Sequence, residues 1–394
     1  MDRSGFPPQL QNRPWPERLA YFHSYTVAHP ALVEAKEKLL CAIQDSAPNT
    51  LILVLGPAGV GKTTLCRKIE QVLTQDMASD LASDPTRLPV VSIEAMAYDS
   101  RTFNWGDHFR RLLLEMEEPL VDYKIAPWPG TPPETSRGVR LGRRPTAAAY
   151  QHAAEQALTF RRPKAVLIDE AQHLAKIPSG RKLADQLDVI KSIASRTRTI
   201  HVLFGTYDLL AFRNLSGQLS RRSIDIHFHR YRLDDQSEKK AFWGALRSFE
   251  QHLPLAEPPD LLQQWEYLYE RSVGCVGVLK QWLDRALAIA ARQNSATFNR
   301  PILEASRLSV SQCEKMLSEA LDGENQLVER ENDVRNLRLR LGLKNNAPEK
   351  NPMPPSTDAI NRSHVQRRWR PGDRRPYRDK VGVGAPVYAA SAVV

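Results

Sequence analysis

The segment from Leu51 to Lys68 constrains the fold of this chain more than any other. Five apolar residues, Leu51-Ile52-Leu53-Val54-Leu55, are followed by a loop with glycines at 56, 59 and 61, and then by Lys62-Thr63. The apolar run and its glycine boundary predict a buried parallel strand, and the residues after the loop favour a helix. Such a loop turns backbone N–H groups toward phosphates at a helix N-terminus, where a partial positive charge favours anions.

This loop predicts a site for ATP and Mg²⁺. Lys62 is expected to reach the β- and γ-phosphates and to act in catalysis, and the hydroxyl of Thr63 is expected to bind Mg²⁺. The residues predicted to contact the nucleotide are Gly56, Pro57, Ala58, Gly59, Val60, Gly61, Lys62, Thr63 and Thr64.

A second set of catalytic candidates follows another apolar run. Ala165-Val166-Leu167-Ile168 is a predicted strand that ends in two acids, Asp169 and Glu170. Asp169 is expected to hold Mg²⁺, and Glu170 to orient and polarise the attacking water. An acidic turn after a strand is the structural alternative, but the glycine loop upstream favours the catalytic interpretation.

Further apolar runs at 88–93, 200–204 and 224–228 alternate with helical stretches at 107–116, 146–159 and 181–196. This alternation predicts an α/β core with a parallel, five-stranded sheet and helices on both faces. Residues 237–249, 260–271 and 276–291 predict three helices of a small lid, and a further helix is expected over 302–321. Residues 1–18, which are rich in proline, glutamine and arginine, are expected to be extended or loosely held.

Three more positions are candidates for the nucleotide site. Thr206 ends the strand at 200–204 and is expected to sense the γ-phosphate or hold the water. Arg221 or Arg222 is expected to reach a neighbouring subunit's ATP, where an arginine stabilises transition-state charge. Lys280, in the first turn of a lid helix, is a candidate phosphate sensor. A solvated arginine pair and a surface lysine are the structural alternatives.

This array resembles the AAA+ family of P-loop ATPases, and three stretches narrow the resemblance. They are Asp169-Glu170-Ala171-Gln172-His173-Leu174, the segment Leu187 to Ala194, and the segment His201 to Leu209. Together they are similar to TnsC/TniB, the ATPase regulators of Tn7-like and Mu-like transposons, some of which are CRISPR-associated. The similarity covers about residues 25–295, and the long C-terminal extension departs from the family pattern.

The resemblance implies a mode of action. ATP-bound subunits are expected to form rings or helical filaments on duplex DNA, to accept a target selector of the TnsD/TniQ type, and to recruit the transposase. Hydrolysis is then expected to disassemble the oligomer. The predicted organisation is an N-terminal extension over 1–25, an AAA+ core over 26–233, a lid and following helix over 234–325, and a charged segment with a disordered basic tail over 326–394.

The charge balance agrees with an anionic partner. Lys and Arg number 55 against 45 Asp and Glu, a formal net charge of +10, which raises the odds of a nucleic-acid partner. DNA contacts are expected at Arg101, Thr102 and Asn104, a region that approaches DNA in AAA+ initiators. Arginines of the insertion at 126–145 are further candidates, with a solvated loop as the alternative: Arg137, Arg140, Arg143 and Arg144.

The C-terminal tail and the location of the protein are predicted from composition. Arginines interspersed with Trp369 and Tyr377 suit nucleic acid, but the family analogy favours a peptide that docks on the transposase. No apolar run is long enough for a membrane span and the N-terminus has no apolar signal segment, so no membrane partner and a cytoplasmic location are expected.

Two rival functions share much of this evidence. An initiator or helicase loader would have the same phosphate-site residues, but would be expected to carry a sequence-specific DNA-binding domain after the lid. A STAND-type signalling switch would also bind nucleotide, but would be expected to carry a large repeat sensor. Neither kind of domain is evident in the sequence.

Overall fold

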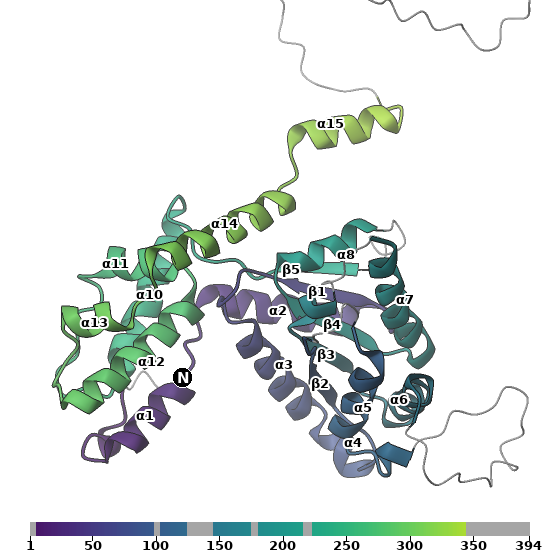
Figure 1. Ribbon diagram of the computed structural model, residues 1–394, viewed down its shortest axis with the longest axis horizontal. Coiled ribbons are helices and arrows are strands. Elements are labelled where there is room, and N and C mark those ends of the chain that lie inside the picture. Colours follow the sequence, from purple (N-terminus) through teal and green to yellow (C-terminus); the bar gives the residue numbers. More distant parts are fainter. Residues whose placement is uncertain (1–4, 98–102, 124–144, 175–179, 216–222, 344–394) are drawn as a thin grey trace, which may run out of the picture. The chain divides into compact units, whose positions relative to one another are not determined.

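The computed structural model describes residues 5–97, 103–123, 145–174, 180–215 and 223–343. Within these residues, five strands form one parallel sheet in the order β2-β3-β4-β1-β5 (Figure 1). The predicted α/β class with a parallel five-stranded sheet is therefore confirmed. The strands are β1 (Leu51–Leu55), β2 (Val90–Glu94), β3 (Ala165–Asp169), β4 (Ile200–Gly205) and β5 (Ser223–His227).

The two faces of the sheet bury separate apolar clusters, because side chains alternate along each strand. Ile52 and Val54 of β1 belong to one cluster, and Leu53 and Leu55 belong to the other. Helices α2 (Pro30–Asp45) and α3 (Lys62–Asp76) cover the first face. The second face is covered by α5 (Trp105–Glu115), α6 (Ala147–Arg161), α7 (Gly180–Thr197) and α8 (Leu210–Leu215). Short helices connect these elements: η1 (Pro8–Leu10), α4 (Ala78–Ser83), η2 (Val121–Tyr123), η4 (Ala171–Leu174) and η5 (Tyr207–Leu209).

A group of helices follows the sheet, as the helical pattern predicts, and shares the first apolar cluster. They are α10 (Gln236–His252), α11 (Trp265–Ser272), α12 (Val276–Gln293) and α13 (Arg300–Ser306). Helix α1 (Trp15–Ser24) packs against α12, and its Phe22 meets Phe249 of α10. The expectation of an extended segment over 1–18 is therefore wrong from Trp15 onward. Prolines are tolerated in a first helical turn, where their missing N–H has no intrahelical partner.

The helix expected over 302–321 is two helices in the structure. Helix α13 ends at Ser306, and α14 (Val310–Leu327) begins after Ser309. Ser309 and Gln312 form a reciprocal capping box, in which each side chain bonds the backbone N–H of the other residue. The backbone N–H groups of a helix N-terminus have no intrahelical partner, and the capping box satisfies two of them. It therefore fixes the start of α14.

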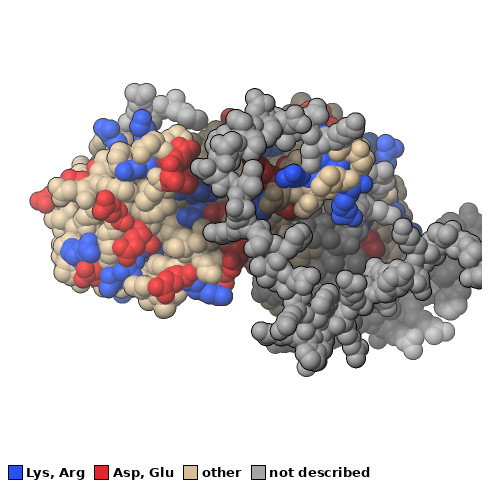
Figure 2. Space-filling model, turned by 90° about the horizontal axis from the view of Figure 1, so that it is seen from above, with Lys and Arg blue, Asp and Glu red and all other residues tan. Residues whose placement is uncertain are grey.

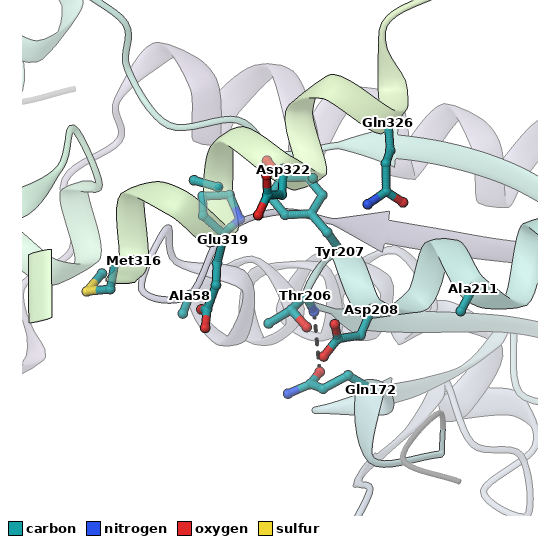
Figure 3. A pocket seen from close by; sticks show the side chains of 13 residues that line it. Ala58, Gln172, Thr206, Tyr207, Asp208, Ala211, Met316, Glu319, Asp322 and Gln326 are labelled. Atoms are coloured by element: carbon teal, nitrogen blue, oxygen red, sulfur yellow. Dashed lines mark hydrogen bonds between the residues drawn. The ribbon is translucent and has the colours of Figure 1, made fainter. Parts of the chain in front are cut away.

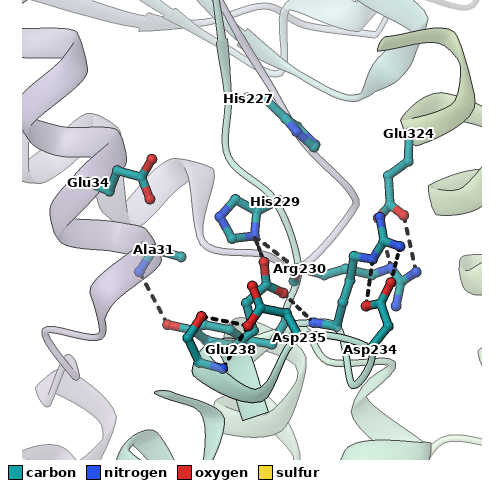
Figure 4. Close-up of polar contacts among 12 residues, drawn as sticks. Ala31, Glu34, His227, His229, Arg230, Asp234, Asp235, Glu238 and Glu324 are labelled. Carbon is teal, nitrogen blue, oxygen red and sulfur yellow. Dashed lines mark hydrogen bonds and ion pairs between the residues drawn. The ribbon is translucent and has the colours of Figure 1, made fainter. Parts of the chain in front are cut away.

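Helix α14 then packs on the α/β core. A side-chain carbon at Gly323 would lie 2.0 Å from the ring of Tyr207, so only glycine allows this approach. Arg230 forms a buried two-bond ion pair with Glu324, with Nε–Oε1 and Nη2–Oε2 distances of 2.8 and 3.2 Å (Figure 4). The contact of Gly323 with Tyr207 and the ion pair of Glu324 with Arg230 therefore hold α14 on the core, next to Thr206.

The chain divides into two compact units, Met1–Glu329 and Arg330–Val394. In the second unit the described part is α15 (Glu331–Arg340) and the residues around it, whose side chains are exposed. Among the described residues, no helix is both long and apolar enough to cross a membrane. On the face in Figure 2, basic and acidic side chains are interspersed over the described part at the left of the view.

Candidate functional site

The loop after β1 has a backbone shape that requires glycine. A side-chain carbon at Gly56 would lie 2.3 Å from the carbonyl oxygen of Phe228, and Gly59 and Gly61 have φ values of +74° and +118°. Residues with side chains rarely adopt such φ values. Gly61 is the N-cap of α3, so the loop ends at a helix N-terminus, as the motif predicts.

Lys62 is held inside this loop. Its Nζ donates to the carbonyl oxygens of Gly56 and Pro57 at 3.0 and 2.9 Å, and the residue is only 7% exposed. Burial lowers the pKa of Lys62 from its ordinary value, while the negative charges of Glu170 and Asp169 act to raise it. The ammonium is thus placed by the loop backbone and faces the two acids that end β3. The side chain of Thr63, the next residue, is exposed.

The two acids lie at the same edge of the sheet as the loop. The Asp169 carboxylate accepts the backbone N–H of Glu170 at 2.9 Å. Glu170 has φ +52°, a left-handed conformation that costs energy in a residue with a side chain. Gln172 of η4 donates to the Glu170 carboxylate. The two neighbouring acids therefore have different partners, the Glu170 N–H for Asp169 and the Gln172 amide for Glu170.

Thr206 lies between the loop and the acids. It follows β4, which pairs with β1 on one side and β3 on the other. Its backbone N–H donates to Gln172 Oε1 at 3.3 Å, while its buried hydroxyl has no hydrogen-bond partner among the described residues. An unpaired buried hydroxyl is costly, so this geometry suits a group that a ligand completes.

Thr206 lines a cavity of about 770 Å³ between the core and α14 (Figure 3). Loop residues Pro57 and Ala58, Gln172 and Thr206 line its core side, and Glu319 and Asp322 are among the α14 residues on the other. The loop and Thr206 predicted from sequence are therefore brought together here. The contribution of α14 has no signal in the sequence.

A second, smaller cavity lies on the other side of the loop. It is lined by residues before α2, by the start of α3, and by the start of α12: Tyr25, Thr26, Val27, His29, Leu32, Val60, Gly61, Thr64, Phe249, Val276, Gly277 and Lys280. The lid touches the loop directly, since the N–H of Val278 donates to the Gly59 carbonyl oxygen at 3.0 Å. No motif in the sequence marks the Tyr25–His29 segment as part of the site. His29-Pro30, a capping residue before a helix-starting proline, is its only local signal.

Lys280 lines this second cavity, but its ammonium is already paired. Its Nζ donates to both carboxylate oxygens of Asp284, at 2.6 and 2.7 Å, and lies 4.2 Å from the ring centre of Phe22. Burial lowers the pKa of Lys280, and the bond to Asp284 raises it. Reaching a phosphate would require Lys280 to leave Asp284, so its role as a phosphate sensor stays a prediction.

A polar cluster at the start of α2 fixes the wall of this cavity. His29 accepts the Leu32 N–H at Nδ1, which is also 3.0 Å from the Tyr231 hydroxyl. That hydroxyl in turn accepts the Ala31 N–H at 3.2 Å, shown by the dashed line from Ala31 in Figure 4. Because Nδ1 accepts, the Tyr231 hydroxyl donates to it. The segment before α2 is therefore tied to the residues after β5.

The remaining predicted contacts are mostly outside the described residues. The Asn104 side chain is exposed and caps α5, where it accepts the Asp107 N–H at 3.1 Å. Its neighbours Phe103 and Trp105 pack with the second apolar cluster, Phe103 buried and Trp105 partly buried. The residues that lie outside the described part are Arg101, Thr102, Arg137, Arg140, Arg143, Arg144, Arg221 and Arg222, together with the tail from 344 onward.

Comparison with known proteins agrees with this geometry. Residues 46–212 match a family model described as an AAA domain. The match includes the loop, both acids and Thr206, the main catalytic candidates that the structure describes. None of the curated proteins matches the chain.

Several solved structures are similar in fold. The Aeropyrum pernix ORC2 protein, solved as ADPNP–ADP complexes, is 15% identical over 74% of this chain and 71% of its own, with a TM-score of 0.47. The Aeropyrum pernix ORC1 protein in complex with DNA is 18% identical over 75% and 68%, with a TM-score of 0.46. Domain III of the Thermotoga maritima replication initiation protein DnaA is 13% identical over 77% and 97%, with a TM-score of 0.37.

Proposed function

We propose that this chain hydrolyses ATP at the loop between β1 and α3. One observation carries the proposal: strands β1, β4 and β3 are neighbours, and their carboxyl ends place Lys62, Thr206 and Glu170 at one edge of the sheet. In open α/β sheets, ligands bind outside this edge. The AAA domain match over 46–212 supports the same reaction.

The site chemistry fits a triphosphate with Mg²⁺. The loop offers backbone N–H groups and the buried Lys62 ammonium to the phosphates, and Thr206 offers its unpaired hydroxyl to the γ-phosphate or the water. Thr63 and Asp169 would hold Mg²⁺, through oxygen ligands that this ion prefers. Bound Mg²⁺ neutralises charge that develops on the phosphates. Glu170 accepts the proton of the attacking water.

We place the adenine ring at the smaller cavity, which at about 70 Å³ has to widen to admit it. Its walls are largely apolar, from Val27, Leu32, Val60 and Val276, with a few polar groups among them, which is the usual composition of a site for a flat ligand. Gly61 and Thr64 join this cavity to the phosphate loop. A nucleotide placed this way would bridge the core and the lid, since Val276 and Gly277 start α12.

The site is proposed to be completed by a second copy of this chain. The first residue of β5, Ser223, pairs with Leu51, at the end of β1 opposite the loop. Arg221 and Arg222, which precede Ser223 in the sequence, are the candidates for an arginine that reaches a neighbour's nucleotide. Arg221 or Arg222 would then make ATP hydrolysis depend on assembly.

The finer proposal is a DNA-bound regulator of transposition of the TnsC/TniB kind. Its support is the sequence of the segments around Asp169–Leu174, Leu187–Ala194 and His201–Leu209, together with the net charge of +10. On this proposal the ATP-bound chain forms rings or filaments on duplex DNA, receives a TnsD/TniQ-type selector, and recruits the transposase through its tail.

Two measurements test these proposals. Purified protein should bind and hydrolyse ATP, Lys62→Ala should lose nucleotide affinity, and Glu170→Gln should keep binding but hydrolyse slowly and form longer-lived oligomers. Hydrolysis by Glu170→Gln at the wild-type rate would remove the role given to Glu170.

Electron microscopy with linear duplex DNA and a slowly hydrolysed analogue should show ATP-dependent rings or filaments. Nucleotide binding with no DNA association at low salt would contradict the DNA proposal and favour a signalling switch.

A further inference from the structure

The side chain of Gln172 connects two parts of the site that no sequence motif joins. It is 7% exposed and lies in η4, two residues after Glu170. Its amide nitrogen donates to one oxygen of the Glu170 carboxylate, and its amide oxygen accepts the Thr206 N–H at 3.3 Å. Figure 3 shows the second contact at the wall of the large cavity. A single planar amide thus links the end of β3 to the end of β4.

The backbone of β4 is shaped to receive this amide. A side-chain carbon at Gly205 would lie 2.7 Å from the Gln172 amide oxygen and 2.7 Å from a methyl carbon of Leu209. Any larger residue at 205 would therefore push the amide out of place. The missing side chain of Gly205 and the N–H of Thr206 therefore both accommodate the amide oxygen of Gln172.

We propose that Gln172 is a positioning residue for hydrolysis, an inference that rests on the ATPase function proposed above. The bond from Gln172 engages one carboxylate oxygen of Glu170 and leaves the other to accept a proton from water. Glu170 stands in a left-handed backbone conformation at φ +52°, and the bond from Gln172 defines where its carboxylate points. The second bond ties that orientation to Thr206.

Glutamine suits this task because it carries a donor and an acceptor on one amide. Gln172→Met keeps similar size but loses both bonds. Gln172→Glu keeps an acceptor for the Thr206 N–H, but replaces the donor that faces Glu170 by a like charge. Gln172→Met therefore tests the two bonds together without a large change in packing, and Gln172→Glu tests the bond to Glu170 while the bond to Thr206 is kept.

The test is steady-state ATP hydrolysis together with binding of a fluorescent ATP analogue. Both variants are expected to bind the analogue within about threefold of wild type, and kcat is expected to fall about ten- to a hundredfold, the usual loss when a catalytic group is misplaced. Gln71→Met, on the exposed face of α3, is the matched control and should keep kcat. Thermal melting checks that each variant is folded.

A double-mutant cycle distinguishes positioning from general support of the fold. In the Glu170→Gln background, the residual single-turnover rate should change less than about threefold on adding Gln172→Met, because residues that act as a unit are not additive. Full additivity, or a wild-type kcat in both single variants, would overturn the inference while leaving the ATPase intact. Absence of hydrolysis by wild type would instead contradict the proposed function and the inference with it.

Discussion

At the scale of single residues, three buried histidines are uncharged at neutral pH. Burial, first of all, lowers the pKa of His29, His108 and His201 from 6.5 to about 4, and the nearby His229 contributes at His29. His201 is fully buried against Thr199, whose carbonyl oxygen lies 3.0 Å from Nδ1. Burying a charged imidazole in such surroundings is unfavourable, so each ring stays neutral in the folded protein.

These histidines predict a pH dependence of stability. The folded-state pKa lies below the unfolded one, so the unfolded chain binds more protons between pH 6.5 and pH 4. The free energy of unfolding is therefore highest above pH 6.5 and falls as the pH is lowered toward 4. His201→Asn, which can still donate to Thr199, should reduce that fall by up to about 3 kcal/mol. Urea denaturation at a series of pH values measures it.

His152→Asn on α6, where the side chain is partly exposed, serves as the matched control for the loss of a histidine. Equal slopes for His201→Asn and wild type would show that burial of His201 does not drive the effect.

At the scale of elements, a buried ion pair is one of the two contacts that dock α14. The side chains of Arg230 and Glu324 are 8% and 10% exposed. Removing one partner of such a pair leaves an uncompensated buried charge, which costs about 3–5 kcal/mol. Glu324→Ala is therefore expected to lower the urea midpoint strongly and to increase hydrogen exchange in α14. Lys315→Ala, whose side chain is 74% exposed, should change stability by less than about 0.5 kcal/mol.

Elements that depend on local patterns could be predicted from the sequence, and those that depend on distant contacts could not. The strands were predictable because parallel strands buried on both faces are continuous apolar runs. The division between α13 and α14 was also signalled, by Ser309 and Gln312 at capping-box spacing. The return of α14 onto Tyr207 was not, because Arg230 and Glu324 are 94 residues apart and neither is part of a motif.

The same distinction holds for the site. Lys62, Asp169, Glu170 and Thr206 end predicted strands or follow a glycine loop, so their meeting at one edge follows from a parallel sheet. Gln172 stands in a stretch that the resemblance singled out, but its role depends on the neighbouring strand. The Tyr25–His29 wall depends on Tyr231, 202 residues from His29, which no local pattern indicates.

At the scale of the whole molecule, the central prediction is that each active site is shared between two copies of the chain. Glu170→Gln keeps ATP binding, Arg221 and Arg222, but lacks the carboxylate that accepts the proton of the attacking water. A variant with both arginines changed to alanine keeps the loop but lacks the proposed trans-acting group. Each variant alone should hydrolyse ATP at less than about a tenth of the wild-type rate, since an arginine finger contributes a thousandfold or more.

Mixing the two variants should then restore activity. With random assembly of an equal mixture in a head-to-tail oligomer, about a quarter of interfaces pair an intact Glu170 with intact arginines. ATPase activity measured with duplex DNA should therefore rise toward about a quarter of wild type. Activity of the mixture no greater than the average of its two components would show that the arginines do not act across the interface. In that case each ATP site would be complete within one chain, and the rate of hydrolysis would not depend on assembly through these arginines.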